Sequence, residues 1–287
     1  MGAPFTRLLL ATEHSEFDSG AEALALALAQ RCALPLAGVL PVLGSPEFEM
    51  VAPQLAAKAD HEASLKREHL LALAQAAGVL LELRVRHGPE PFEEIVQEAQ
   101  VRAADLIIIR RRGQRGLLAR LLVGEMVSKV VAHAPCSVLV APRGARMWQR
   151  RVLVGVDPLA VDAAMLALAA RLAADCGLPL GVLCVASDAA AGPRATAALA
   201  SALAQARATC SSADGELRVG PAHQQLLAAA ADGGADLIVI GRHSRHGRRA
   251  RIGREAQKVL GLAECPVLVY AHPYAHPHAH NPKPTIP

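Results

Sequence analysis

The feature that most constrains the fold is an internal duplication. The stretch Asp105–Pro142 recurs as Asp236–His272, with the same order of apolar, glycine-bearing, helical and apolar segments. The beginnings of the two copies match as well, because Arg7–Glu13 is similar to Arg151–Asp157. Each copy is the size of a domain, so the pattern indicates a tandem duplication rather than a solenoid of short repeats.

Each copy carries the pattern of an open sheet covered by helices. Leu106–Ile109 is a short apolar run bounded by charge, which is typical of a parallel strand buried on both faces. A basic loop with glycines follows, then a helical spacing of apolar residues from Gly124, and a second apolar strand at Val138–Val140. This order is one turn of a doubly wound sheet, so the sequence predicts an α/β fold with two flavodoxin-like, doubly wound parallel-sheet domains in tandem.

The remaining elements are predicted in the same order in both halves. In the first half we expect strands and helices alternating along Leu8–Ala11, Ala21–Arg31, Ala37–Val42, Gln54–Ala77, Leu80–Val85 and Pro91–Ala103, with a loop over Leu43–Pro53. In the second half the corresponding ranges are Val152–Val156, Asp162–Cys176, Leu180–Val185, Arg194–Cys210, Glu216–Val219 and Gln224–Asp232. The apolar face of the long helix is expected to run through Leu55, Leu65, Leu70 and Leu73. The predicted division is a first domain over 1–142, a linker over 143–150, a second domain over 151–271 and a disordered Pro/His tail over 272–287.

Composition agrees with two compact domains. Hydrophobic residues make up 52% of the 287 residues but aromatic residues only 2%, so the cores are expected to consist of Ala, Leu and Val. No apolar run reaches the roughly 18 residues that a membrane span needs, and Met1–Leu10 lacks the regions of a signal peptide. The pairs Cys32/Cys176 and Cys136/Cys265 occupy matching positions and are interpreted as reduced, buried small hydrophobic residues. We therefore expect a cytoplasmic protein without membrane contact.

Chemistry is expected at the carboxyl ends of the strands, where ligands bind in open α/β sheets. Three segments of each half meet there: the turn after the first strand with Glu13 or Asp157, the end of the second strand with Val42 or Val185, and the glycine loop. A glycine loop that leads into a helix directs backbone N–H groups at one point, which suits a phosphate. An acidic residue across the crevice can accept a hydrogen bond from a ribose hydroxyl or a base amine.

Both halves resemble universal stress protein domains. The residues that carry the resemblance are the acidic turns, Gly88-Pro89, Gly220-Pro221, Asp105-Leu106-Ile107, Asp236-Leu237-Ile238, Ala134–Val140 and Glu264–Val269. The resemblance implies adenine nucleotide alpha hydrolase-like domains, a non-enzymatic role in stress response or regulation, and adenine nucleotide binding in some members. It also implies dimers joined through the last strands, so Val138–Ala141 and Val267–Tyr270 are expected to pair within this chain as a pseudo-dimer.

The first half departs from the glycine pattern of the nucleotide-binding members. That pattern is Gly-x-x-Gly, nine residues, then Gly-Ser or Gly-Thr. Arg110 stands at the first glycine and Glu125 at the hydroxyl residue, and the spacing is one residue longer than in the family. A carboxylate at a helix N-terminus satisfies the dipole itself and repels phosphate. The nucleotide site of the first half is therefore predicted to be degenerate; its residues are Glu13, Val42, Gly113, Gly116, Gly124 and Glu125.

The second half is the better candidate for binding, although its spacing is one residue shorter than in the family. The predicted nucleotide site consists of Asp157, Val185, Gly241, Ser244, Gly247, Gly253 and Arg254, with Ser244 replacing a glycine and Arg254 the hydroxyl residue. The same loop holds further arginines, Arg242, Arg245, Arg248, Arg249 and Arg251. Guanidinium groups suit phosphates, but arginines on a loop can equally lie in solvent.

Two functions stay open from the sequence. One is a module that senses ATP or another adenine nucleotide through the C-terminal half, and the other is a ligand-free interaction protein with both sites degenerate. A slow nucleotide hydrolase is a weaker third hypothesis, because no general base is identified on these loops. No catalytic residue is therefore assigned. Protein partners are expected, further self-association stays open, and neither nucleic acid nor a metal is expected. The tail histidines His272, His276, His278 and His280 are not assigned a metal.

Overall fold

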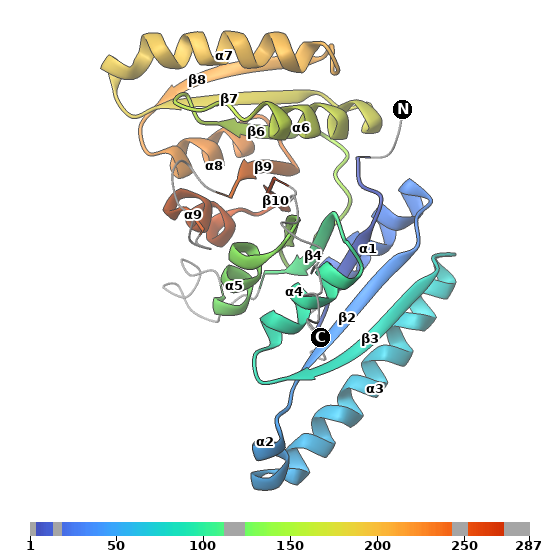
Figure 1. Ribbon diagram of the computed structural model, residues 1–287. Helices are drawn as coiled ribbons and strands as arrows, with labels where there is room; N and C mark the ends of the chain where they lie inside the picture. The colour runs from blue at the N-terminus through green and yellow to red at the C-terminus, as the bar shows by residue number, and fades with distance from the viewer. Residues whose placement is uncertain (1–3, 14–18, 112–123, 243–251, 273–287) are drawn as a thin grey trace, which may run out of the picture.

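The computed structural model describes residues 4–13, 19–111, 124–242 and 252–272 and joins both halves in one sheet. The ten strands follow the order β3-β2-β1-β4-β5-β10-β9-β6-β7-β8 (Figure 1). In the first half the strands are β1 Leu8–Ala11, β2 Leu36–Leu43, β3 Leu81–Gly88, β4 Leu106–Arg110 and β5 Ser137–Ala141. In the second half they are β6 Val152–Val156, β7 Leu180–Ala186, β8 Ala213–Val219, β9 Leu237–Gly241 and β10 Val267–Tyr270. Strands within each half are parallel in the doubly wound order, which confirms the predicted fold class.

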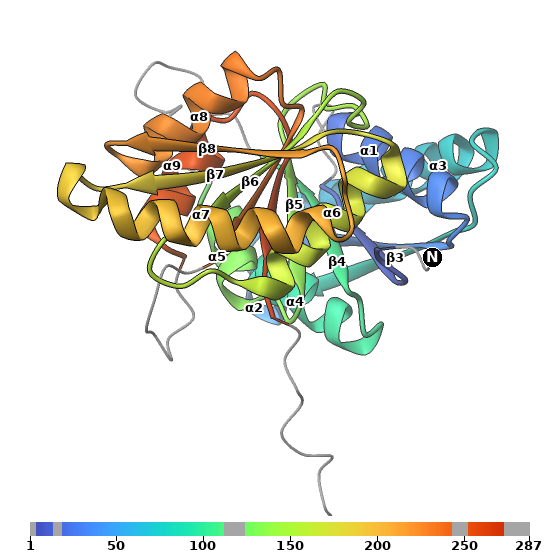
Figure 2. The ribbon, with the colours of Figure 1, turned by 90° about the horizontal axis from the view of Figure 1, so that it is seen from above.

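Helices cover both faces of the sheet. Those of the first half are α1 Ser19–Cys32, α2 Pro46–Val51, α3 Pro53–Ala76, α4 Pro91–Val101 and α5 Glu125–His133. Those of the second half are α6 Ala163–Cys176, a 3₁₀ turn at Ala189–Ala191, α7 Gly192–Arg207, α8 Ala222–Asp232 and α9 Arg254–Leu262. Helices α1, α3, α6 and α7 pack in one hydrophobic cluster, and α4, α5, α8 and α9 in another. Figure 2 shows the strands between them, fanned out by their twist.

The apolar strand runs explain the two clusters. Successive side chains of a strand point to opposite faces, so Leu8 and Leu10 join one cluster while Leu9 and Ala11 join the other. A strand that is covered on both faces must therefore be apolar throughout, as these are. Within the described ranges, no helix is both long and apolar enough to cross a bilayer.

The two halves meet through their last strands. Strands β5 and β10 pair antiparallel, with Val140, Leu139 and Val138 opposite Val267, Leu268 and Val269. The predicted pairing of these edges within one chain is confirmed. Each half thereby covers the edge that the other would expose.

A buried arginine reinforces this junction from the second half. Arg242 follows β9 directly, and its residue is only 8% exposed. Its guanidinium donates to the backbone carbonyls of Ala132 at 3.2 Å, Ala134 at 2.8 Å and Cys136 at 3.4 Å. These carbonyls lie at the C-terminal end of α5 and beyond it, where helix carbonyls have no intrahelical partner and a cation is favoured.

The first half repeats this contact in the opposite direction. Arg111 follows β4, and its Nη1 donates to the carbonyl of Leu260 at 3.1 Å and to that of Ala263 at the end of α9. Burial lowers the pKa of Arg111 from its very high ordinary value, because removing the guanidinium from water disfavours its charged form. Each half thus caps a helix of the other.

The prediction of a loop over Leu43–Pro53 is wrong, because this segment contains α2. Ser45 accepts a hydrogen bond from the backbone N–H of Phe48 at 3.1 Å, and Pro46 occupies the first turn. Serine followed by proline is a common helix start, since the serine oxygen satisfies a free N–H and proline has none to satisfy. The density of prolines obscured this signal in the sequence.

The predicted apolar face of α3 is confirmed at Leu70 and wrong at Leu55, Leu65 and Leu73. Leu55 is 60% exposed and Leu65 is 53% exposed, whereas the residues that α3 buries are Ala63, Leu70 and Ala74. Two of these three are alanines, whose short side chains let the helix approach the sheet. Leucine positions alone therefore gave only part of the buried face.

The segment predicted as a linker packs into the molecule. Trp148 is 3% exposed and Ala145 is 6% exposed, and both belong to the cluster that includes α1 and α6. Gly20 allows close approach here, since a Cβ on it would lie 2.6 Å from the carbonyl oxygen of Pro142. The proposed domain limits stay a prediction, but this connection is part of the core. The predicted tail lies outside the described residues after His272.

The halves differ at two helix ends. Ala33 and Ala103 adopt left-handed φ values of 52° and 47°, at positions where the second half has Gly177 at 66° and Gly234 at 65°. A Cβ is strained in this region, and glycine is the usual residue there.

We expect Ala103→Gly to raise the free energy of unfolding by about 1 kcal/mol, because strain is relieved. Gly234→Ala should lower it by a similar amount, since nothing lies within 4 Å of the added Cβ and strain is the main change. Urea unfolding of both variants measures this. A loss of stability in Ala103→Gly would contradict the interpretation.

Replacing Arg242 by methionine should destabilise the protein by about 2 kcal/mol, because buried carbonyls at the end of α5 lose their donor. Arg111→Met should act in the same direction. The exposed Arg146 supplies the control, and Arg146→Met should change stability by less than about 0.5 kcal/mol. Equal changes in the unfolding temperature for all three variants would show that the hydrogen bonds between the halves do not contribute to stability.

Candidate functional site

A cavity opens in the second half at the carboxyl ends of β6, β7 and β9. Its volume is about 510 Å³, within the roughly 300–1,000 Å³ typical of ligand pockets. Residues of α6, α8 and α9 complete the wall, including Met165, Leu226, Ala256 and Val259. The lining is mostly apolar with a few polar groups, as in small-molecule sites generally.

The cavity brings together four of the seven residues predicted for this site. Asp157, Val185, Gly241 and Gly253 line it. Arg254 is the first residue of α9 and is exposed, and it is not part of the lining. Ser244 and Gly247 lie outside the described residues, as do Arg245, Arg248, Arg249 and Arg251. A role of these residues in binding nucleotide stays a prediction.

Local hydrogen bonds fix the acidic side of the cavity. Asp157 follows β6, and its Oδ1 accepts from the backbone N–H of Leu159 at 2.8 Å, which closes a tight turn. Asp162 caps α6 by accepting from the N–H groups of Ala164 at 3.1 Å and Met165 at 3.0 Å. Both carboxylates line the cavity. The turn therefore presents Asp157 at the place where the sequence predicts a ribose or base contact.

Arg242 lines the cavity, but its guanidinium points away from the cavity. Its guanidinium is directed to the carbonyls beyond α5 in the first half, not to a phosphate position in front of α9. Its own carbonyl accepts from the N–H of Gly253 at 3.1 Å and so fixes the start of α9. This arginine contributes structure to the site rather than free positive charge.

A histidine and a glutamate that the sequence did not single out also line the cavity. Glu255 Oε2 accepts from the backbone N–H of His223 at 2.9 Å and lies 2.8 Å from its Nδ1. Burial raises the pKa of Glu255, but the hydrogen bonds from His223 outweigh burial, and the net pKa is below its ordinary value. The two residues begin α8 and α9 and are distant in sequence, so no local signal marked them. At the corresponding positions of the first half stand Phe92 and Met126.

The crevice of the first half is occupied by an ion pair. Arg110, in the position of Gly241, places its Nη2 2.6 Å from Oε2 of Glu13. Only 11% of the Arg110 side chain and 14% of the Glu13 side chain are exposed. Val42 is buried, and Glu125 is largely exposed and pairs with Lys129 at 3.1 Å. Gly124 is the residue before α5, whereas Gly113 and Gly116 lie outside the described residues.

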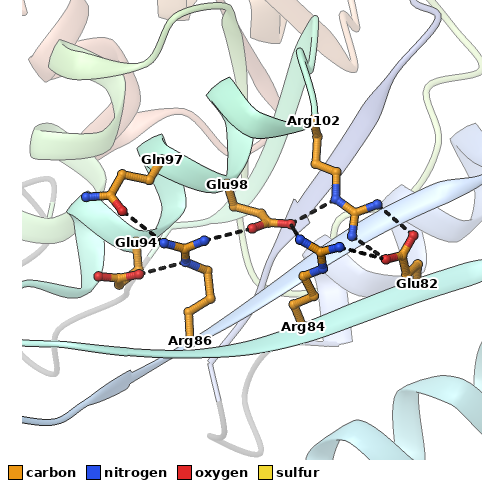
Figure 3. A network of polar contacts seen from close by, with 7 residues as sticks. All are labelled: Glu82, Arg84, Arg86, Glu94, Gln97, Glu98 and Arg102. Atoms are coloured by element: carbon orange, nitrogen blue, oxygen red, sulfur yellow. Dashed lines mark hydrogen bonds and ion pairs between the residues drawn. The ribbon is translucent and has the colours of Figure 1, made fainter.

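The first half also holds a network of charges between β3 and α4 (Figure 3). Glu98 is fully buried, with Arg102 Nε at 2.9 Å, Arg86 Nη1 at 3.1 Å and Arg84 Nη1 at 3.6 Å. The second half has the buried Ala229 at this position of α8. Three arginines satisfy the buried carboxylate, so the network anchors α4 to the sheet rather than forming a catalytic pair. Among the described residues, no group of three metal-ligating side chains gathers in one place.

Comparison with known proteins shows to which family the chain belongs. The sequence model of the Universal stress protein family matches the chain twice, over residues 4–142 and 149–271. The chain belongs to the universal stress protein family. It carries two universal stress protein domains in tandem, and the resemblance predicted from the sequence is confirmed.

Individual relatives agree with this assignment. A universal stress protein of Thermus aquaticus is 35% identical over 142 residues, which are 47% of this chain and 98% of the relative. One of Methanocaldococcus jannaschii is 27% identical over 147 residues, 48% of this chain and 83% of the relative. A solved universal stress protein from Archaeoglobus fulgidus aligns with 92% of this chain and 97% of its own with a TM-score of 0.69. At 17% identity that likeness shows the fold alone.

The charge network makes a prediction about pH. Two hydrogen bonds from Arg102 lower the pKa of the exposed Glu82 to about 2. A carboxylate with a lowered pKa stabilises the folded state above its ordinary pKa, and this contribution is lost as the pH falls towards 2. In carboxyl NMR titrations, Arg102→Met should return the pKa of Glu82 towards its ordinary value. Arg84→Met should shift it less, because Arg84 is the weaker partner. An ordinary pKa of Glu82 in the unchanged protein would refute the pairing.

Proposed function

We propose that this universal stress protein is a non-enzymatic ligand-sensing protein whose second half binds ATP or another adenine nucleotide. The observation that carries the proposal is the cavity of about 510 Å³ in which Asp157, Val185, Gly241 and Gly253 converge. Asp157 would accept a hydrogen bond from a ribose hydroxyl, and Val185 would contact the base. Gly241 at the end of β9 and Gly253 directly before α9 carry no side chain and would let the ligand approach the backbone.

The first half supports the proposal by contrast. Both halves have the same fold, yet Arg110 places its guanidinium against Glu13 where the second half has Gly241 and Asp157. A ligand in the first crevice would have to break a mostly buried ion pair, which is strongly unfavourable. We therefore infer one ligand site per chain rather than two.

A second candidate function rests on the phosphate end of the second site. Glu255 places a carboxylate at the start of α9, and Arg254 is exposed beside it rather than directed into the cavity. A carboxylate at this point competes with phosphate for the helix dipole. The alternative is thus an interaction protein that holds no nucleotide and acts through protein partners.

Calorimetric titration with magnesium ATP and with adenosine tests the proposal. We expect one site per chain, and at least a tenfold loss of affinity in Asp157→Ala, because a hydrogen bond to the ribose is removed. Glu13→Ala, the same change in the first half, should leave binding unaltered. Gly241→Arg, which copies Arg110, should abolish it.

The outcomes separate the two candidates. Two sites per chain, or equal losses in Asp157→Ala and Glu13→Ala, would refute the assignment of one site to the second half. Absence of heat with either compound at millimolar concentration, together with no thermal shift, would favour the ligand-free interaction protein.

A further inference from the structure

The cysteines fall into two groups that differ in accessibility. Among the described residues no cysteine is in a disulfide, and Cys136, Cys184 and Cys210 are buried. Burial raises the pKa of Cys136 to about 12 and that of Cys184 to about 11. The interpretation of Cys32, Cys136, Cys176 and Cys265 as buried small hydrophobic residues therefore holds for Cys136 only. Cys32, Cys176 and Cys265 are partly exposed.

Cys32 and Cys176 come from corresponding places in the two halves. Cys32 is the last residue of α1 and Cys176 is the last residue of α6. In a two-fold arrangement a residue lies near its own counterpart only when both are close to the axis. If the ends of α1 and α6 meet, Cys32 and Cys176 therefore lie close to the pseudo-two-fold axis between the halves.

The ends of α1 and α6 do meet. Arg31 Nη2 donates to the backbone carbonyl of Asp175 at 3.0 Å, which joins the residues directly before the two cysteines. Both cysteines also pack against the same hydrophobic cluster. The hydrogen bond thus brings together, across the boundary between the halves, the two helix ends that carry these partly exposed thiols.

We propose that Cys32 and Cys176 are an oxidation site at which a peroxide links the two halves by a disulfide. Hydrogen peroxide oxidises one thiol to a sulfenic acid and is reduced to water. The second thiol attacks the sulfenic sulfur, the S–S bond forms, and a second water leaves. Two thiols and one peroxide thereby give one disulfide and two waters.

The surroundings of the pair select it over the other cysteines. Burial raises the pKa of Cys32, while the guanidinium of Arg31 opposes this shift. Reaction through the thiolate therefore becomes faster as the pH rises. Cys265 is also partly exposed, but burial raises its pKa to about 11, and it packs against the hydrophobic cluster of α4, α5, α8 and α9 rather than the cluster that Cys32 and Cys176 contact. Cys265 is therefore the matched control.

Peptide mapping of the intact protein tests the proposal. After treatment with hydrogen peroxide at pH 8 and alkylation of the remaining thiols, we expect one disulfide-linked pair of peptides, which contain Cys32 and Cys176. Dithiothreitol should remove it. Cys32→Ser and Cys176→Ser should each abolish the link, and Cys265→Ser should leave its yield unchanged. The unfolding temperature should rise on oxidation in the unchanged protein and in Cys265→Ser only, because the link constrains the unfolded chain.

Other products would overturn the proposal. These are sulfinic acid at either cysteine without a link, a link that involves any other cysteine, or disulfides only between separate chains. Mapping of the unchanged protein alone distinguishes these products, so the test does not depend on the folding of a variant.

Discussion

The antiparallel contact between β5 and β10 is the interaction on which the rest of the structure depends. It joins two parallel five-stranded sheets into one and covers the apolar edge of each. The arginines after β4 and β9 complete this contact, because each donates to the free carbonyls at a helix end of the opposite half. Sheet and helices are therefore joined across the same boundary. Arg242 also supports the candidate site, since its carbonyl holds Gly253 at the start of α9.

Within this shared scaffold the two crevices have different chemistry. The second half retains a hollow with Asp157 and the glycines, and it adds the contact between His223 and Glu255. The first half instead contains the ion pair of Arg110 with Glu13. One fold thus supports a cavity at the strand ends of one half and an ion pair at those of the other, because residues at strand ends can change without disturbing the apolar strands between the helices.

Features set by local sequence could be predicted, and features set by distant contacts could not. Leu8–Ala11 and Val152–Val156 were predicted with their observed limits, because uniformly apolar runs bounded by charge mark buried strands. Asp157, Val185 and Gly241 line one cavity because strand ends converge at one edge of the sheet, and Gly253 joins them directly before α9. The direction of Arg242 was not predictable, since its carbonyl partners lie more than a hundred residues away. The contact between His223 and Glu255 likewise depends on two helix starts from different parts of the chain.

The packed connection around Trp148 has a consequence for how the halves associate. When two separate chains pair through an edge strand, the fraction paired depends on their concentration. Here the chain between β5 and β6 is part of the core, so the partner edge is always present at a high effective concentration. The assembled sheet is then as complete in a dilute sample as in a concentrated one. The half that carries the ion pair of Arg110 with Glu13 is thus a permanent structural partner for the half that carries the cavity.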